Sequence, residues 1–130
     1  MSANTIGLGR SVLIVDDDED LRDVIAEDFT DQGYNVFVAE SGEEALRLFV
    51  QERIDVVLTD IQMPNFNGIQ LIKALKEINA KQNNRSHFII MTGFTKYSRE
   101  ELLSCGATDL IEKPIGRNEM LKKITSLFKT

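Results

Sequence analysis

The residues of this sequence that are best suited to chemistry are acidic, hydroxyl and ammonium groups that each follow an apolar run. In chain order they are Asp16, Asp17, Asp18, Asp60, Thr92 and Lys113. Clustered carboxylates repel one another unless a cation lies among them or one of them is protonated. Oxygen ligands without histidine or cysteine suit Mg²⁺ far better than zinc. If the fold brings these residues together, they predict a magnesium site.

The lysine and the threonine add what a magnesium site needs in order to hold a phosphoryl group. The Lys113 ammonium is a point charge for one phosphoryl oxygen, and the Thr92 hydroxyl can donate to another. A carboxylate can also act as a nucleophile and form an acyl phosphate. Asp60 is the candidate because it stands alone after its run, whereas residues 16–18 have the composition of a metal-ligand set. We therefore predict a phosphoryl group on Asp60, held between a metal and a lysine.

Each candidate also has an ordinary structural explanation. An aspartate after a strand commonly caps the next helix, and Asp18 suits that role because negative charge favours a helix start. A Lys–Pro pair such as Lys113–Pro114 often forms a turn, and threonine favours strands. The sole histidine, His87, and the sole cysteine, Cys105, are expected to be incidental, the cysteine as a core residue. The functional interpretation therefore depends on the candidates sharing one end of one sheet.

Strand patterns alternate with helical patterns along the whole chain. Runs of branched and aromatic residues predict strands at 11–15, 34–39, 54–59, 88–91 and 109–112. Helical spacing predicts a helix after each run, the first of which has an apolar face of Leu21, Val24, Ile25 and Phe29. Capping boxes begin two helices at Ser41 and Ser98, and residues 79–86 are expected to be a loop.

This alternation predicts an α/β fold, a doubly wound sandwich with a parallel sheet covered on both faces. The consecutive aliphatic residues 12–15 agree with it, because strands buried on both faces are apolar throughout. Ligands of such sheets bind beyond the carboxyl ends of the strands, where the strand order reverses. All the candidate residues follow strands, so we expect them to enclose a single pocket at that edge.

Composition excludes several kinds of protein. A chain of 130 residues fits one domain, and its net charge of −6 argues against direct binding of nucleic acid. No apolar run approaches the roughly 20 residues that span a bilayer, so no membrane contact is expected. A single cysteine suits a reducing cytoplasm. Residues 1–10 have no signal-peptide pattern and are expected to be a flexible lead-in to a domain at 11–130.

Over residues 11–129 the sequence resembles the receiver domains of two-component response regulators. The similarity is carried by the acidic pair after the first strand, the acceptor loop from Asp60 through Met63 and Pro64 to Gly68, the pair Thr92–Gly93, and Lys113–Pro114 with a cis-type proline. The resemblance implies a flavodoxin-like three-layer sandwich with five helices and a five-stranded sheet in the order 2-1-3-4-5. It also implies a signalling phosphoacceptor with self-catalysed chemistry rather than an enzyme.

Roles for single residues follow from the same resemblance. Asp60 would accept the phosphoryl group from a sensor histidine kinase or a histidine phosphotransfer protein. Asp17 would bind Mg²⁺ directly, Asp16 through water or at a second position, and Gln62 through its backbone carbonyl. Lys113 and Thr92 would bind phosphoryl oxygens. Phosphorylation would then shift the surface of the fourth helix, fifth strand and fifth helix toward a downstream target or output domain that the sequence does not identify.

One position departs from the family pattern. Many receivers have an aromatic residue three positions before the lysine, and this sequence has Leu110 there. Tyr97 or Phe94 could take over the role of that ring, or both could simply pack or face solvent. Gln62 and Phe94 are also expected to flank the path of attacking water, so that a bulky Phe94 would shield the acyl phosphate.

Three other functions fit parts of the pattern. A Mg²⁺-dependent aspartyl phosphatase would use Asp16 and Asp18 as nucleophile and acid, and would need no Asp60. A degenerate receiver would only bind other proteins, but the acidic pair, Asp60, Thr92 and Lys113 are all retained. A nucleotide-binding flavodoxin-like domain fits least, since no glycine-rich loop follows the first strand.

Overall fold

The strands form one parallel sheet in which the first strand in sequence does not lie at an edge. They are β1 (Ser11–Val15), β2 (Asn35–Ala39), β3 (Val56–Asp60), β4 (His87–Thr92) and β5 (Asp109–Glu112). In this computed structural model, which describes residues 9–62, 67–93 and 95–128, the strand order is β2-β1-β3-β4-β5. All neighbouring strands are parallel. The doubly wound topology and the strand order predicted above are confirmed.

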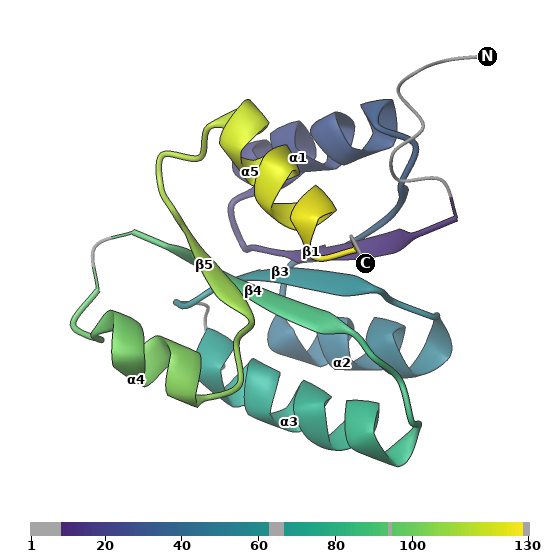
Figure 1. The fold of residues 1–130 in the computed structure, drawn as a ribbon, viewed down its shortest axis with the longest axis vertical. Coiled ribbons are helices and arrows are strands. Elements are labelled where there is room, and N and C mark those ends of the chain that lie inside the picture. Colours follow the sequence, from purple (N-terminus) through teal and green to yellow (C-terminus); the bar gives the residue numbers. More distant parts are fainter. Residues whose placement is uncertain (1–8, 63–66, 94, 129–130) are drawn as a thin grey trace.

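Helices cover both faces of the sheet (Figure 1). They are α1 (Glu19–Asp31), α2 (Gly42–Gln51), α3 (Gly68–Lys81), α4 (Arg99–Ser104) and α5 (Arg117–Ser126). Figure 1 shows α1 and α5 on one face, with α2, α3 and α4 on the other. The strand order reverses between β1 and β3, so a ligand site is expected beyond the carboxyl ends of these two strands.

Strand β1 divides the core into two halves. Its five residues are all buried, and their side chains alternate between the two faces of the sheet. Leu13 and Val15 pack in the cluster with Phe49 of α2, whereas Val12 and Ile14 pack with the residues of α1 and α5. A strand that is buried on both faces must be apolar along its whole length, which explains the uninterrupted aliphatic run.

Helix α1 differs from its prediction at one residue. Ile25 and Phe29 are buried as expected, but Val24 is 57% exposed. Successive residues of a helix are about 100° apart, so Val24 points well away from the stripe that Ile25 and Phe29 form. The expected apolar face was therefore too wide, and Val24 lies on the solvent side of it.

Several element boundaries also differ from those predicted. Helix α3 continues to Lys81, so residues 79–81 are helical and not part of a loop. Its end is marked by Asn83, whose φ is +55°. Tyr34 precedes β2, because its N–H donates to the Phe29 carbonyl and completes the turn that ends α1. β3 begins at Val56 and includes Asp60 as its last residue.

Side chains cap the starts of the two helices for which the sequence predicts capping boxes. Ser98 and Glu101 form a full capping box at α4. Ser41 accepts from the Glu44 N–H at 3.2 Å, but the Glu44 carboxylate accepts from the Glu40 N–H and not from Ser41. The box predicted at α2 is therefore half formed.

Two expectations concern the ends of the chain and its environment. The predicted lead-in at 1–10 falls mostly on residues 1–8, which lie outside the described residues. Among the helices of the described ranges, none combines the length and apolar character that crossing a bilayer requires.

Candidate metal and phosphoryl site

Sheet register places the acidic residues side by side. Strands β1 and β3 pair with Val15 opposite Thr59, so Asp16 and Asp60 follow at adjacent positions of the carboxyl edge. Carboxylate oxygens of Asp16, Asp17 and Asp60 all lie within 4.8 Å of one another. This spacing brings together hard oxygen ligands from two strand ends, which is the donor set that suits Mg²⁺.

The three carboxylates differ in exposure. Asp16 is completely buried and Asp17 is exposed, while the Asp60 side chain is 16% exposed. One Asp60 oxygen accepts from the Ile61 N–H at 2.8 Å. The other, Oδ2, faces Lys113. Asp60 is thus accessible and held in place, as a nucleophile must be.

Lys113 connects the acidic residues to the fifth strand. Its Nζ lies 3.3 Å from Asp60 Oδ2 and 3.4 Å from Asp16 Oδ2. Its backbone N–H donates to the Thr92 carbonyl at 2.6 Å, which joins the ends of β4 and β5. The ammonium therefore partly neutralises two crowded carboxylates and is placed to hold a further anionic oxygen.

Burial disfavours the charged form of Asp16. Desolvation raises the pKa of this carboxyl above its ordinary value, and the Asp60 charge adds to that rise. The Asp18 N–H, which donates to Asp16 Oδ1 at 2.9 Å, and the Lys113 ammonium both oppose it. A buried carboxylate beside a second carboxylate is stabilised in its charged form by a nearby cation, so the donor set fits a divalent metal ion.

A cavity of about 230 Å³ opens directly at Asp60. It is lined by Asp60, Ile61, Gln62, Gly93, Thr95 and Lys113. Gln62 therefore borders the space in front of the predicted acceptor, where its carbonyl is expected to act. A Cβ added at Gly93 would lie 3.8 Å from the Lys113 side chain, with no other described atom within 4 Å apart from those of the adjacent residues.

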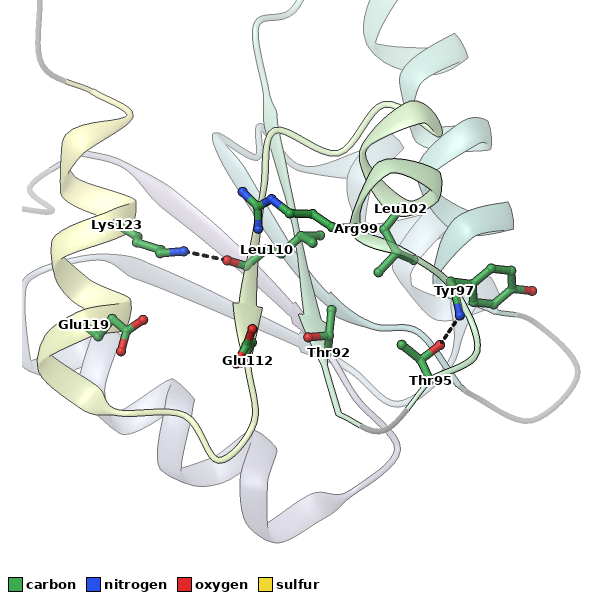
Figure 2. A pocket seen from close by; sticks show the side chains of 9 residues that line it. All are labelled: Thr92, Thr95, Tyr97, Arg99, Leu102, Leu110, Glu112, Glu119 and Lys123. Atoms are coloured by element: carbon green, nitrogen blue, oxygen red, sulfur yellow. Dashed lines mark hydrogen bonds between the residues drawn. The ribbon is translucent and has the colours of Figure 1, made fainter.

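Thr92 lies at the same edge but lines a neighbouring cavity. That second cavity measures about 370 Å³ and is bounded by α4, β5 and α5 (Figure 2). The single pocket expected from the sequence is thus two adjacent cavities in this structure. Thr95 lines both of them.

Asp18 and His87 have the ordinary roles considered for them. Asp18 caps α1, where its Oδ1 accepts from the Leu21 N–H at 3.2 Å. His87 begins β4 at the opposite end of the sheet, in edge-to-face contact with Phe128. Cys105 is buried, and burial raises the pKa of its thiol.

Gly68, which the sequence places at the end of the acceptor loop, has a packing role that the pattern does not show. It donates its N–H to the Ile61 carbonyl, and a Cβ there would overlap the Asp60 carbonyl oxygen. Thr95 was not recognised from the sequence, because nothing in the pattern shows that its loop turns toward Asp60.

Some of the expected site residues lie outside the described residues. They are Met63 and Pro64 of the acceptor loop and Phe94, with its predicted shielding role. Leu110, which stands where many receivers have an aromatic residue, is buried at 6% exposure. Tyr97, a candidate to replace that ring, lines the larger cavity. The proline of Lys113–Pro114 is cis, as the resemblance implied.

Comparison with known proteins identifies the family of this chain. Residues 12–125 match the response regulator receiver domain. The regulatory protein AtoC of Escherichia coli (strain K12) is 39% identical over 110 residues, which are 84% of this chain and 23% of AtoC. The transcriptional regulatory protein CpxR of that strain is 34% identical over 119 residues, 91% of this chain and 49% of CpxR. The chain thus spans half or less of these curated relatives.

Solved structures agree with the sequence relatives. The chemotaxis protein CheY4 of Vibrio cholerae superposes with a TM-score of 0.83 at 28% identity, covering 92% of this chain and 98% of that chain. The receiver domain of the Francisella response regulator 1452 has a TM-score of 0.79 at 32% identity, covering 92% and 96%. The match extends over nearly the whole length of both structures.

Proposed function

This chain belongs to the response regulator receiver domain family of two-component systems, and within that family we propose that Asp60 is the residue that accepts the phosphoryl group, in a Mg²⁺-dependent reaction. The observation that carries the proposal is the position of Lys113, whose Nζ is within 3.4 Å of carboxylates on two different strand ends. Such a cation beside an accessible carboxylate supports a phosphoryl site.

The metal would be held by Asp16, Asp17, Asp60 and the backbone carbonyl of Gln62. Support comes from the close approach of the three carboxylates and from the burial of Asp16. When bound, Mg²⁺ neutralises charge on the phosphoryl oxygens and orients them. The protein residues keep these ligands fixed, since the Asp18 N–H and Lys113 both bind Asp16.

The transfer step uses Asp60 as the nucleophile. An oxygen of its carboxylate forms a bond to phosphorus while the P–N bond of a phosphohistidine breaks, and the imidazole keeps the electron pair. Lys113 binds a phosphoryl oxygen during this step. Asp60 loses its negative charge when it is phosphorylated, so the phosphoryl oxygen replaces its carboxylate as the anionic partner of the ammonium. The donor would be a sensor histidine kinase or a histidine phosphotransfer protein.

Phosphorylation would act on the rest of the molecule through Thr92. In this structure Thr92 lines the cavity beside α4, β5 and α5 rather than the one at Asp60. Movement of its hydroxyl toward a phosphoryl group would change that cavity and the surface around it, as a shift between two states of the domain. The surface of α4, β5 and α5 is therefore the proposed output face.

A phosphatase that uses Asp16 and Asp18 is less well supported. Asp18 is committed to capping α1 through the Leu21 N–H, and Lys113 contacts Asp60 and Asp16. We therefore propose a phosphoacceptor that catalyses its own phosphorylation and dephosphorylation, and not an enzyme that turns over phosphate esters.

Replacing Asp60 by Asn tests the acceptor. The wild-type protein, incubated with Mg²⁺ and acetyl phosphate, should gain the mass of one phosphoryl group in intact-protein mass spectrometry. The Asp60→Asn variant should gain none, while Asp23→Asn, a change at an exposed acid of α1, should behave as wild type. Continued phosphorylation of Asp60→Asn, or turnover of phosphate esters by that variant, would refute the proposal.

A further inference from the structure

The cavity beside α4, β5 and α5 has an apolar floor and a charged rim. Leu102 of α4 and Leu110 of β5 form the floor and are both buried. Its volume of about 370 Å³ exceeds that of the cavity at Asp60. Figure 2 shows the Tyr97 ring directed away from Leu110, so the ring does not fill the space above this floor.

The two cations of the rim are already engaged. Arg99 of α4 forms an ion pair with Asp109 at 3.5 Å, and Lys123 of α5 approaches the same carboxylate at 3.7 Å. Lys123 Nζ also donates to the Leu110 carbonyl at 2.8 Å, as Figure 2 shows. Asp109 thus pairs with the positive charges of α4 and α5 and partly neutralises them.

The two carboxylates of the rim are in the opposite situation. Glu112 at the end of β5 and Glu119 in the first turn of α5 are both exposed. Across residues 9–62, 67–93 and 95–128, neither carboxylate has a hydrogen bond or an ion pair. In Figure 2 the Glu119 carboxylate extends from α5 toward Glu112. The rim therefore has unpaired negative charge at one end.

We propose that this cavity binds the side chain of an arginine from a partner protein. The guanidinium would lie between Glu112 and Glu119, and the aliphatic stem would lie in the cavity that Leu102 and Leu110 help to line. Arginine suits the site because its planar head donates to two carboxylates at once, and because charge-assisted hydrogen bonds of this kind are strong. The exposure of both acids leaves the head group accessible from outside.

This site would add a specificity element to the proposed output face. Thr92 and Thr95 line this cavity and Thr95 also lines the one at Asp60, so an occupant would contact a residue that borders the phosphoryl site. The biological meaning rests on the proposed phosphoacceptor function, but binding itself does not require phosphorylation. Failure of one proposal can therefore be told apart from failure of the other.

A titration followed by ¹H–¹⁵N NMR tests the binding. The probe is N-acetyl-arginine methylamide, added to unphosphorylated protein in saturating Mg²⁺ so that the acidic residues at Asp60 are occupied. The amides of Leu110, Glu112 and Glu119 should shift in a saturable manner. The citrulline analogue has nearly the same shape without the charge and should bind about tenfold more weakly. Equal binding of the two probes, or shifts confined to other regions, would overturn the proposal.

Variants separate the two carboxylates from general charge. The double variant E112Q/E119Q should weaken the arginine probe about tenfold, since it removes both acceptors of charge-assisted bonds. E100Q changes an exposed acid of α4 that does not line the cavity and should leave binding unchanged. L110Y should block binding by filling the floor, and its spectrum reports whether it folds. Equal losses in E100Q and E112Q/E119Q would refute the site.

A second copy of the chain is the competing occupant of this face. Dilution of the protein without any probe should leave the amides of Leu110, Glu112 and Glu119 unchanged. Concentration-dependent shifts or broadening confined to those amides would show self-association there and would overturn the assignment to an arginine of a different protein.

Discussion

Lys113 Nζ lies 3.3 Å from Asp60 Oδ2, so the ammonium that follows β5 faces the carboxylate that ends β3. The same ammonium is 3.4 Å from the buried Asp16. A metal ion that binds these carboxylates must therefore do so against the repulsion of a positive charge. Lys113 is therefore expected to weaken Mg²⁺ binding and to favour the binding of a phosphoryl group.

Replacing Lys113 by Met should raise Mg²⁺ affinity and impair phosphorylation. Removal of one positive charge a few ångströms from the metal ligands should tighten Mg²⁺ binding about three- to tenfold. Calorimetric titration at constant ionic strength measures this change, with Lys122→Met at an exposed position of α5 as the control. If Lys113→Met bound Mg²⁺ with an affinity equal to or lower than that of the wild type, the proposed repulsion between Lys113 and the metal ion would be contradicted.

Gly68 should tolerate no side chain. A Cβ at this residue would overlap the Asp60 carbonyl oxygen, which is backbone and cannot move aside alone. We expect Gly68→Ala to lower the free energy of unfolding by about 1–3 kcal/mol, as other overpacked sites do. Gly116→Ala is the control, since its Cβ would meet only Glu119 Cβ at 4.0 Å. Equal stability of both variants in urea unfolding would show that α3 shifts without cost.

Adjacent residues of α1 should respond very differently to truncation. Ile25 is 1% exposed and Val24 is 57% exposed. Ile25→Ala should cost about 2–5 kcal/mol of unfolding free energy, because it removes buried carbons and leaves a cavity. Val24→Ala should change stability by no more than about 0.5 kcal/mol, as surface substitutions do. A large loss in Val24→Ala, measured by chemical unfolding, would mean that a partner surface or a second copy covers this residue.

His87 should make stability depend on pH. Burial lowers its pKa, and the Asp55 carboxylate opposes this effect. The unfolded chain therefore binds the proton more readily than the folded protein. The contribution of His87 to the free energy of unfolding is fully present above a pH of about 6.5 and decreases as the pH falls below that value. His87→Gln should remove this decline. The free energy of unfolding is measured against pH for the wild type and the variant, and the difference gives the contribution of His87 alone. Asp16 contributes equally to both curves, and its raised pKa acts in the opposite direction. Parallel curves would contradict the prediction.

Much of the site follows from local sequence. Strand and helix patterns alternate in a way that allows only a parallel sheet with crossovers, and the strands of such a sheet end at one edge. That is why Asp16, Asp60 and Lys113 could be assigned to one edge before the structure was known. The proximity of their charged groups confirms this part of the prediction.

Local patterns were enough to identify the residues that reach the carboxyl edge, because apolar periodicity and strand ends are properties of short segments of the chain. The packed structure was needed to show that Thr92 lines a separate cavity, that Val24 faces solvent, and that Thr95 borders both cavities. These outcomes depend on how helices and loops pack against the sheet. Contacts between elements distant in sequence set the direction of each side chain, and no local pattern records them.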